Sequence, residues 1–260
     1  MSYYFGEKTW PEIEAAIKKD TLLILPVGTT EEHGRHLPVE TDAMIAKMFG
    51  DAIAQELKDE IPLLVMQPVW YGYSQKVMTQ WPGTIRLRTR TFMDMIYDIL
   101  SSVIEMGFKK VVLLDCHGHH DALLKTVMRE IADDYNVYIA ITSPAGFSTK
   151  RFQEIRKSER GGAIHGCEWE TSLIMYYRDD LVKESEFTNV DIMRYNSEFV
   201  AGDNFTGGQK VVWSTWGIQK SKTGIYGDPT CASVETGAEV VRAAIENYKK
   251  FIQENYAANS

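Results

Sequence analysis

The residues best suited to chemistry lie in one short stretch, residues 31–42, which reads Glu-Glu-His-Gly-Arg-His-Leu-Pro-Val-Glu-Thr-Asp. It follows an apolar run at residues 22–28 that is typical of a buried strand. Six of its twelve residues can bind a metal ion or carry a proton. Carboxylates and imidazoles at this density are costly to bury without a ligand, so the stretch predicts part of a metal or proton-transfer site.

The histidines of the chain are clustered in the same way. All six fall in three short segments, which contain His33 and His36, then His117, His119 and His120, and finally His165. Neutral imidazole is the commonest metal ligand, and mixed sets of imidazoles and carboxylates suit Zn²⁺, Mn²⁺ or Fe²⁺. The clusters adjoin predicted strand ends or a helix start, so we expect them to converge on metal ions.

Two pairs of residues have a spacing that favours a shared metal. Residues i and i+2 of an extended loop point the same way. The pairs are Glu31 with His33 and His117 with His119. His120 and Asp121 would then be outer groups that orient the ligands. The alternative is a helix cap by Asp121 with exposed histidines.

The sequence leaves two possible roles for each of two further carboxylates. Asp42 either bridges two metals or caps the helix predicted to begin there. Glu170 either reaches the metals together with His165 or complements the dipole of the helix that it opens. Glu32 and Glu40 are expected to face solvent.

Apolar runs alternate with helical periodicity along the chain. Runs that are apolar throughout indicate strands covered on both faces, as in a parallel sheet. The segment at 144–162 is either a helix or a mobile arm, and 210–216 is a short strand candidate. The β-α-β alternation predicts right-handed crossovers in one α/β domain over residues 1–260. The predicted strands are 22–27, 63–69, 111–114 and 137–142, and the predicted helices include 12–19, 42–57, 91–106, 122–135 and 233–254.

Composition narrows the class of protein. A net charge of -8 argues against a nucleic-acid or anionic-membrane partner and favours a small-molecule substrate or a metal. No apolar run approaches the roughly 18 residues needed to span a bilayer, and no secretory signal is visible. Three cysteines without a CxxC pair are typical of a reducing compartment. We therefore expect a cytoplasmic protein.

Six short motifs occur in order between residues 25 and 229. They are Leu-Pro-Val-Gly-Thr-Thr-Glu-Glu-His-Gly with Asp42, Tyr-Gly-Tyr-Ser at 71–74, Pro-Gly-Thr at 82–84, Cys-His-Gly at 116–118, His-Gly with Glu-Thr-Ser at 165–172, and Gly-Asp-Pro at 227–229. In these motifs the chain resembles the creatininase family of metal-dependent hydrolases. The resemblance implies a three-layer sandwich with a mostly parallel sheet flanked by helices, two divalent metal ions per subunit, and a homo-oligomer, often a hexamer.

The resemblance also implies roles for individual residues. Asp42 stands at the bridging position, and His165 matches the histidine that contacts substrate and shuttles a proton in creatininase. We expect His165 and Glu170 to be catalytic, and Zn²⁺ or Mn²⁺ to be favoured over Fe²⁺. With His119 added from its spacing, the expected metal ligands are Glu31, His33, Asp42, His117, His119 and Glu170.

The chain departs from creatininase in its second cluster. Creatininase reads His-Tyr-Glu there and uses the glutamate as a ligand, whereas this chain reads His-Gly-His at 117–119. Many other members read His-Gly-Gly-Asn. Gly118 replaces the tyrosine of the creatinine pocket, and a Trp-Asp pair before the histidine of the third cluster is missing, so creatinine is disfavoured as substrate. Aromatic residues can stack on a ring or pack in an interface or the core. The expected substrate-binding residues are Tyr71, Tyr73, Ser74, Trp81 and Gly118.

These features predict a hydrolase that opens a small cyclic amide, formamide or keto-ring compound with water activated by two metals. Other branches of the family act on formamidopyrimidine nucleotides, on a precursor peptide of a redox cofactor, or on oxidised inositols. The alternatives are C–C cleavage of an oxidised inositol of the 3-dehydro-scyllo-inosose type, a non-catalytic metal-binding member of the fold, and an isomerase or lyase that uses one metal on a keto-sugar.

Overall fold

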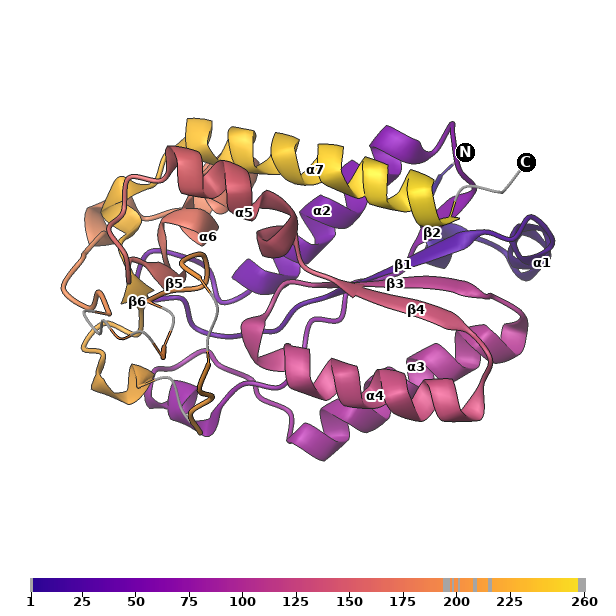
Figure 1. Cartoon of the computed structure of the whole chain (residues 1–260), viewed down its shortest axis with the longest axis horizontal. Helices are drawn as coiled ribbons and strands as arrows, with labels where there is room; N and C mark the ends of the chain where they lie inside the picture. Colours follow the sequence, from indigo (N-terminus) through magenta and orange to yellow (C-terminus); the bar gives the residue numbers. More distant parts are fainter. Residues whose placement is uncertain are drawn as a thin grey trace.

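A four-stranded parallel sheet forms the centre of the molecule (Figure 1). The computed structural model describes residues 2–193, 197, 199–200, 202–207, 210–214 and 217–256. The strands lie in the order β2-β1-β3-β4. Their bounds are β1 (Leu22–Val27), β2 (Leu63–Val65), β3 (Lys110–Asp115) and β4 (Tyr138–Thr142). Val27 pairs with Asp115, so the loops that leave β1 and β3 start level with each other.

Helices cover both faces of this sheet, which confirms the predicted three-layer arrangement (Figure 1). Every residue of β1 is buried. Leu22 and Ile24 pack towards α2, α6 and α7, whereas Leu23 and Leu25 pack towards α3 and α4. Among the described residues, no helix has the length and apolar character to cross a membrane. The helix bounds are α1 (Trp10–Lys18), α2 (Thr41–Leu57), α3 (Thr89–Met106), α4 (Asp121–Asp134), α5 (Pro144–Ile155), α6 (Glu168–Arg178) and α7 (Val234–Tyr256).

Four features differ from the prediction or decide between its alternatives. β2 ends at Val65 instead of residue 69, because Pro68 has no N–H to donate to the sheet. The first part of 144–162 is the helix α5 and not an arm. Residues 210–214 form no strand, and 215–216 lie outside the described residues. A short antiparallel pair of β5 (Ala163–His165) and β6 (Tyr226–Gly227) was not predicted.

A close approach between β1 and α2 depends on Gly28. A Cβ atom built on Gly28 would lie 2.5 Å from the backbone nitrogen of Ala43, nearer than real Cβ atoms come. Any larger residue would therefore push the start of α2, with Asp42, away from the end of β1.

We expect Gly28→Ala to lower the free energy of unfolding by about 1–3 kcal/mol, the usual cost of overpacking. Urea denaturation monitored by circular dichroism measures this. Gly146→Ala is the matched control, because no described atom lies within 4 Å of its added Cβ and alanine suits a helix. Equal stability of Gly28→Ala and the natural protein would show that the close approach is not required.

Candidate active site

The loop from β1 to α2 brings Glu31 and His33 into the interior, where each residue is 1% exposed. His33 Nδ1 lies 2.9 Å from the carbonyl oxygen of Glu31. Because a carbonyl only accepts, Nδ1 carries the proton and Nε2 is the basic nitrogen. Nε2 lies 3.3 Å from Oδ1 of Asp42. The loop thus directs a carboxylate and an imidazole nitrogen towards the interior.

Asp42 occupies the middle of the site. Asp42 is only 1% exposed. One of its carboxylate oxygens faces His33, and the other lies 2.8 Å from His117 Nδ1. Glu40 holds the N-cap position of α2, so the interpretation of Asp42 as the N-cap is wrong. A carboxylate whose two oxygens face two different ligand groups has the arrangement of a bridging ligand in a dinuclear site.

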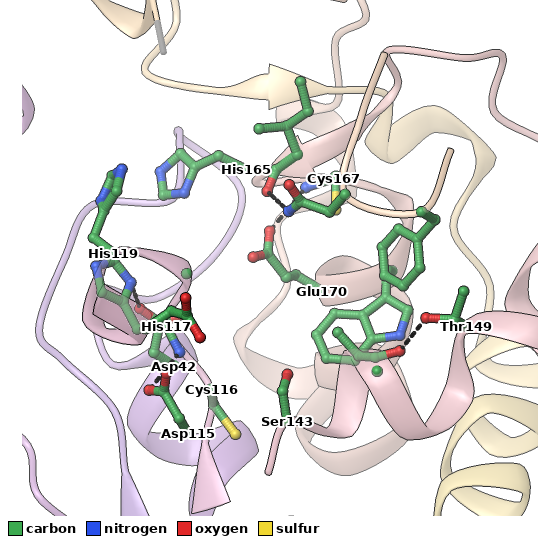
Figure 2. Close-up of a pocket in the computed structure, with 18 of the residues that line it drawn as sticks. Asp42, Asp115, Cys116, His117, His119, Ser143, Thr149, His165, Cys167 and Glu170 are labelled. Atoms are coloured by element: carbon green, nitrogen blue, oxygen red, sulfur yellow. Dashed lines mark hydrogen bonds and ion pairs between the residues drawn. The ribbon is translucent and has the colours of Figure 1, made fainter. Parts of the chain in front are cut away.

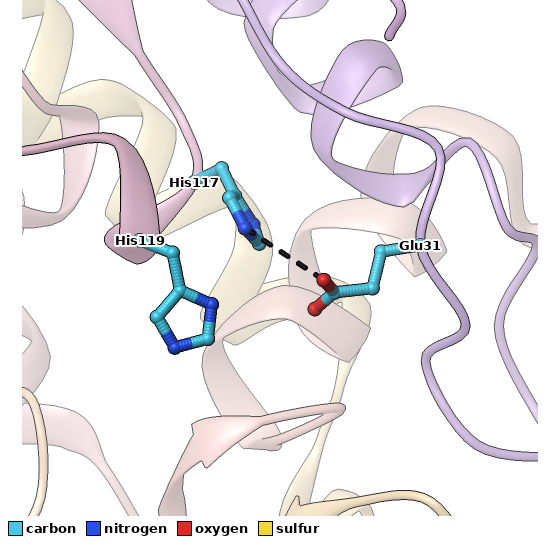
Figure 3. Close-up of side chains that lie close together, drawn as sticks. All are labelled: Glu31, His117 and His119. Atoms are coloured by element: carbon cyan, nitrogen blue, oxygen red, sulfur yellow. Dashed lines mark ion pairs between the residues drawn. The ribbon is translucent and has the colours of Figure 1, made fainter. Parts of the chain in front are cut away.

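The end of β3 supplies two more imidazoles (Figure 3). His117 Nε2 lies 3.7 Å from Glu31 Oε2. His119 follows on a short 3-10 turn, and its ring centre is 5.2 Å from that of His117. The donor atoms of Glu31, His117 and His119 all lie within 4.8 Å of one another. Burial and then the charge of His117 lower the pKa of His119 to about 3, so its ring is neutral, the form that binds metals.

A second group forms on the other side of Asp42. His165 ends β5, and its Nε2 lies 2.8 Å from the carbonyl oxygen of Glu32. Its Nδ1 is directed to the carboxylates, 3.7 Å from Glu31 Oε1. The donor atoms of His33, His165 and Glu170 lie within 4.8 Å of one another. Glu31 and His33, which the i, i+2 spacing placed on one metal, therefore belong to different groups.

Glu170 serves two purposes at the start of α6. One oxygen accepts a hydrogen bond from the backbone nitrogen of Cys167 at 3.2 Å. The other lies 3.9 Å from His33 Nε2. The two interpretations from the sequence, a helix-end group and a site group, are thus compatible.

Several buried atoms of the site have no hydrogen-bond partner among the described residues. They include both carboxylate oxygens of Glu31, Nε2 of His33 and Nε2 of His117. Buried polar atoms are normally paired, and an uncompensated buried charge costs several kcal/mol. Nitrogen and oxygen donors of this kind are the ligands of Zn²⁺ and Mn²⁺, so the residues present fit divalent cations.

Without metals, the charges around the site favour the protonated forms of His33 and His117. Burial lowers the pKa of His33, but Asp42 and then Glu170 outweigh it and raise the pKa to about 10. For His117, Glu31 and Asp42 outweigh burial and raise the pKa to about 9. Burial also opposes charge on Asp42, yet His33 and His117 hold its pKa well below the usual range.

The positions of two neighbouring residues, Glu32 and His36, differ from what the sequence predicted. Glu32 is 3% exposed, so its predicted exposure to solvent is wrong. Its Oε2 accepts a hydrogen bond from the Gly34 backbone nitrogen at 2.9 Å. His36 is buried with Nε2 3.0 Å from Thr171 Oγ1. Burial and then the charges of the other site histidines lower its pKa to about 3, and it lies outside both donor groups.

His120 faces away from the donors and ties two loops together. Its Nδ1 lies 3.1 Å from Asp115 Oδ1, and its Nε2 accepts a hydrogen bond from the Tyr73 backbone nitrogen at 3.1 Å. The same oxygen of Asp115 accepts from the backbone nitrogen of His117. The ring stacks on Phe92 with centres 4.2 Å apart. This is the outer, orienting role predicted for His120, whereas Asp121 pairs with an exposed lysine.

A cavity of about 630 Å³ opens in front of the donors (Figure 2). Its volume suits a small molecule. Gly118, a predicted substrate-binding residue, lines this cavity. Ser143 follows β4, and the rule that ligands bind beyond the carboxyl ends of parallel strands could have identified it. The lining residues that the sequence analysis missed include Lys125, Ser143, Thr149, Trp169, Asn204 and Phe205.

The other predicted substrate-binding residues lie outside the lining of this cavity. Tyr71 is half exposed and Ser74 is fully buried. Tyr73 is tied to His120 by its backbone, and Trp81 follows a short 3-10 turn at Lys76–Gln80. Their contact with substrate stays a prediction.

The chain belongs to the creatininase family, because the family model "Creatininase: Creatinine amidohydrolase" matches residues 6–252. It is 23% identical over 268 residues to 3-dehydro-scyllo-inosose hydrolase of Thermotoga maritima, covering 96% of this chain and 83% of that protein. It is 28% identical over 200 residues to creatinine amidohydrolase of Pseudomonas putida, covering 70% and 74%. A crystal structure of creatinine amidohydrolase (creatininase) superposes with a TM-score of 0.82 at 22% identity, covering 99% of both chains.

Metal binding is expected to release protons. At about pH 7 the raised pKa values of about 10 and about 9 keep His33 and His117 protonated in the metal-free protein. Ligand imidazoles must be neutral, so loading should release about two protons per chain. The number should fall as pH rises through those values. Calorimetric titration with ZnCl₂ in buffers of different ionisation enthalpy measures it.

His36→Gln is the control for proton release, because the low pKa of His36 leaves it without a titrating proton at about pH 7. A release near zero at that pH would show that the metal-free imidazoles are neutral and would contradict the assigned charge balance.

His120→Ala is expected to loosen the loop at residues 70–74. Loss of a buried hydrogen bond costs about 1–3 kcal/mol, so the Tyr73 amide should exchange with deuterium at least about fivefold faster. Hydrogen-exchange mass spectrometry of the peptide that contains Tyr73 measures this. His36→Ala removes an equally buried imidazole away from the loop and is the matched control. Unchanged exchange in His120→Ala would mean that other contacts hold the loop.

Proposed function

We propose that this chain is a metal-dependent hydrolase that opens a small cyclic amide, formamide or keto-ring compound. The observation that carries the proposal is the pair of buried donor groups on either side of Asp42, both facing a cavity of about 630 Å³. Membership in a family whose curated relatives are hydrolases supports the same reaction class.

In this proposal Asp42 would be shared between two divalent cations, with Zn²⁺ and Mn²⁺ favoured. Solved structures similar to this chain include forms described as "Creatininase Mn" and as a "Zn-Zn type" creatininase mutant. When bound, such a pair supplies a water of lowered pKa and a Lewis acid for the substrate carbonyl. Glu31, His117 and His119 would hold one cation, and His33 and Glu170 the other.

His165 and Glu170 would handle the protons. The hydrogen bond from His165 Nε2 to the Glu32 carbonyl fixes the ring, so that Nδ1, on the side of the carboxylates, can accept a proton from the attacking water. One oxygen of Glu170 stays bonded to the start of its helix, and the other faces the site. It can pass a proton to the leaving atom, as general acid–base catalysis requires.

Hydrolysis of an oxidised inositol, with cleavage of a C–C bond next to a ketone, is the second candidate. The relative named 3-dehydro-scyllo-inosose hydrolase matches 96% of this chain. The hydroxyl side chains of Ser143 and Thr149 lie across the cavity from His117 and His119 (Figure 2), and the amide of Asn204 also lines it. Such groups can bond to the hydroxyls of a polyol ring.

A substrate panel separates these candidates. Metal-loaded protein is incubated with ring amides, formamides and inosose derivatives, and the products are weighed by mass spectrometry. A hydrolase adds the mass of one water, whereas an isomerase leaves the mass unchanged. Stoichiometric metal without turnover of any compound would favour a non-catalytic member of the fold.

Asp42→Ala is expected to remove both cations and to lower activity by at least about 100-fold, because the bridging carboxylate serves both ions. Metal content is measured by plasma mass spectrometry after gel filtration. Asp121→Asn is the matched control, because Asp121 also lines the cavity but pairs with Lys125. If Asp42→Ala retained both ions, the bridging role would be wrong.

A further inference from the structure

The group around Glu31 is richer in imidazole than in carboxylate. It contains the imidazoles of His117 and His119 and the one carboxylate of Glu31. Imidazole nitrogen suits Zn²⁺, whereas carboxylate oxygen suits Mn²⁺. Both imidazoles come from one short segment, at positions 117 and 119, so the donor type of this group can be tested by single substitutions.

His119 is the exchangeable member of that group. Glu31 and His117 are fully buried, whereas His119 is half-buried on the turn Gly118–His120. Figure 3 shows its ring beside His117 and opposite the Glu31 carboxylate. A substitution at the half-buried position 119 is therefore expected to disturb the core less than one at Glu31 or His117.

We propose that the cation site of Glu31, His117 and His119 selects Zn²⁺ against Mn²⁺, and that His119 sets this selectivity. The inference rests on the proposed function, since it requires that these donors hold a cation. A carboxylate in place of the imidazole at position 119 would change the donor type in the direction that favours Mn²⁺.

Competition for metal tests the proposal without measuring activity. Metal-free full-length protein is dialysed against Zn²⁺ and Mn²⁺ at equal free concentrations set by a chelator buffer, and bound metals are counted by plasma mass spectrometry. Because Zn²⁺ binds more tightly than Mn²⁺ to most such sites, the informative quantity is the change in the bound Zn²⁺ to Mn²⁺ ratio. We expect His119→Glu to lower this ratio by roughly tenfold.

Two further variants keep the experiment decisive. His119→Gln removes the nitrogen ligand without adding charge and should also lower the ratio, even if His119→Glu fails to fold. His36→Gln alters a buried imidazole outside both groups and should leave the ratio unchanged. Two bound ions with an unaltered ratio in folded His119→Glu or His119→Gln would overturn the selectivity alone. The absence of bound metal from the natural protein would overturn the proposed function as well.

Discussion

The carboxylate of Asp42 is buried between two imidazoles, and the arrangement of the surrounding loops depends on keeping that charge compensated. An uncompensated buried charge costs several kcal/mol, a large part of the roughly 5–15 kcal/mol by which a domain is stable. His33 and His117 must therefore lie within about one hydrogen-bond length of opposite oxygens, as they do at 3.3 and 2.8 Å. The pairing of Val27 with Asp115 makes this possible, because both loops start at the same level.

The strand order explains why the site lies where it does. The chain passes from β1 to β2 on one side of the sheet and then crosses to β3 on the other side. Loops that leave neighbouring strands in opposite directions open a crevice beyond their carboxyl ends. Asp42 enters that crevice on the first turn of α2, and His117 enters it directly after β3. The end of β4 supplies Ser143 to the cavity wall. The fold thus prepares the crevice, and the loop sequences fill it with imidazoles and carboxylates.

Local sequence pattern was sufficient to predict most elements of the central sheet and its helices, and insufficient to predict how the loops of the site come together. The apolar run at 22–27 predicted β1 with its observed bounds, and the run at 111–114 lies within β3. Alternation in an extended loop placed Glu32 towards solvent. Here the loop is irregular: Glu32 hydrogen-bonds back to Gly34 and lies against Gly224. The division of Glu31 and His33 between two groups depends on partners more than 80 residues away in sequence, which no local pattern encodes. The position of Phe205 at the cavity also depends on a distant partner. Arg156 forms an ion pair with Asp203, and Asp203 in turn accepts a hydrogen bond from the backbone nitrogen of Phe205.

Protons and metal cations compete for the same charge balance. The carboxylates that would hold cations raise the pKa values of His33 and His117 to about 10 and about 9, so two protonated imidazoles compensate the site when metals are absent. The two hydrophobic cores on either face of the sheet supply stability that does not involve the site. Unlike small zinc domains, which fold only with their metal, this chain is therefore expected to fold without cations. Its cation affinity would then rise with pH as those protons are lost. A fall in activity at acid pH under limiting metal would reflect displaced cations before it reflected protonation of a catalytic base.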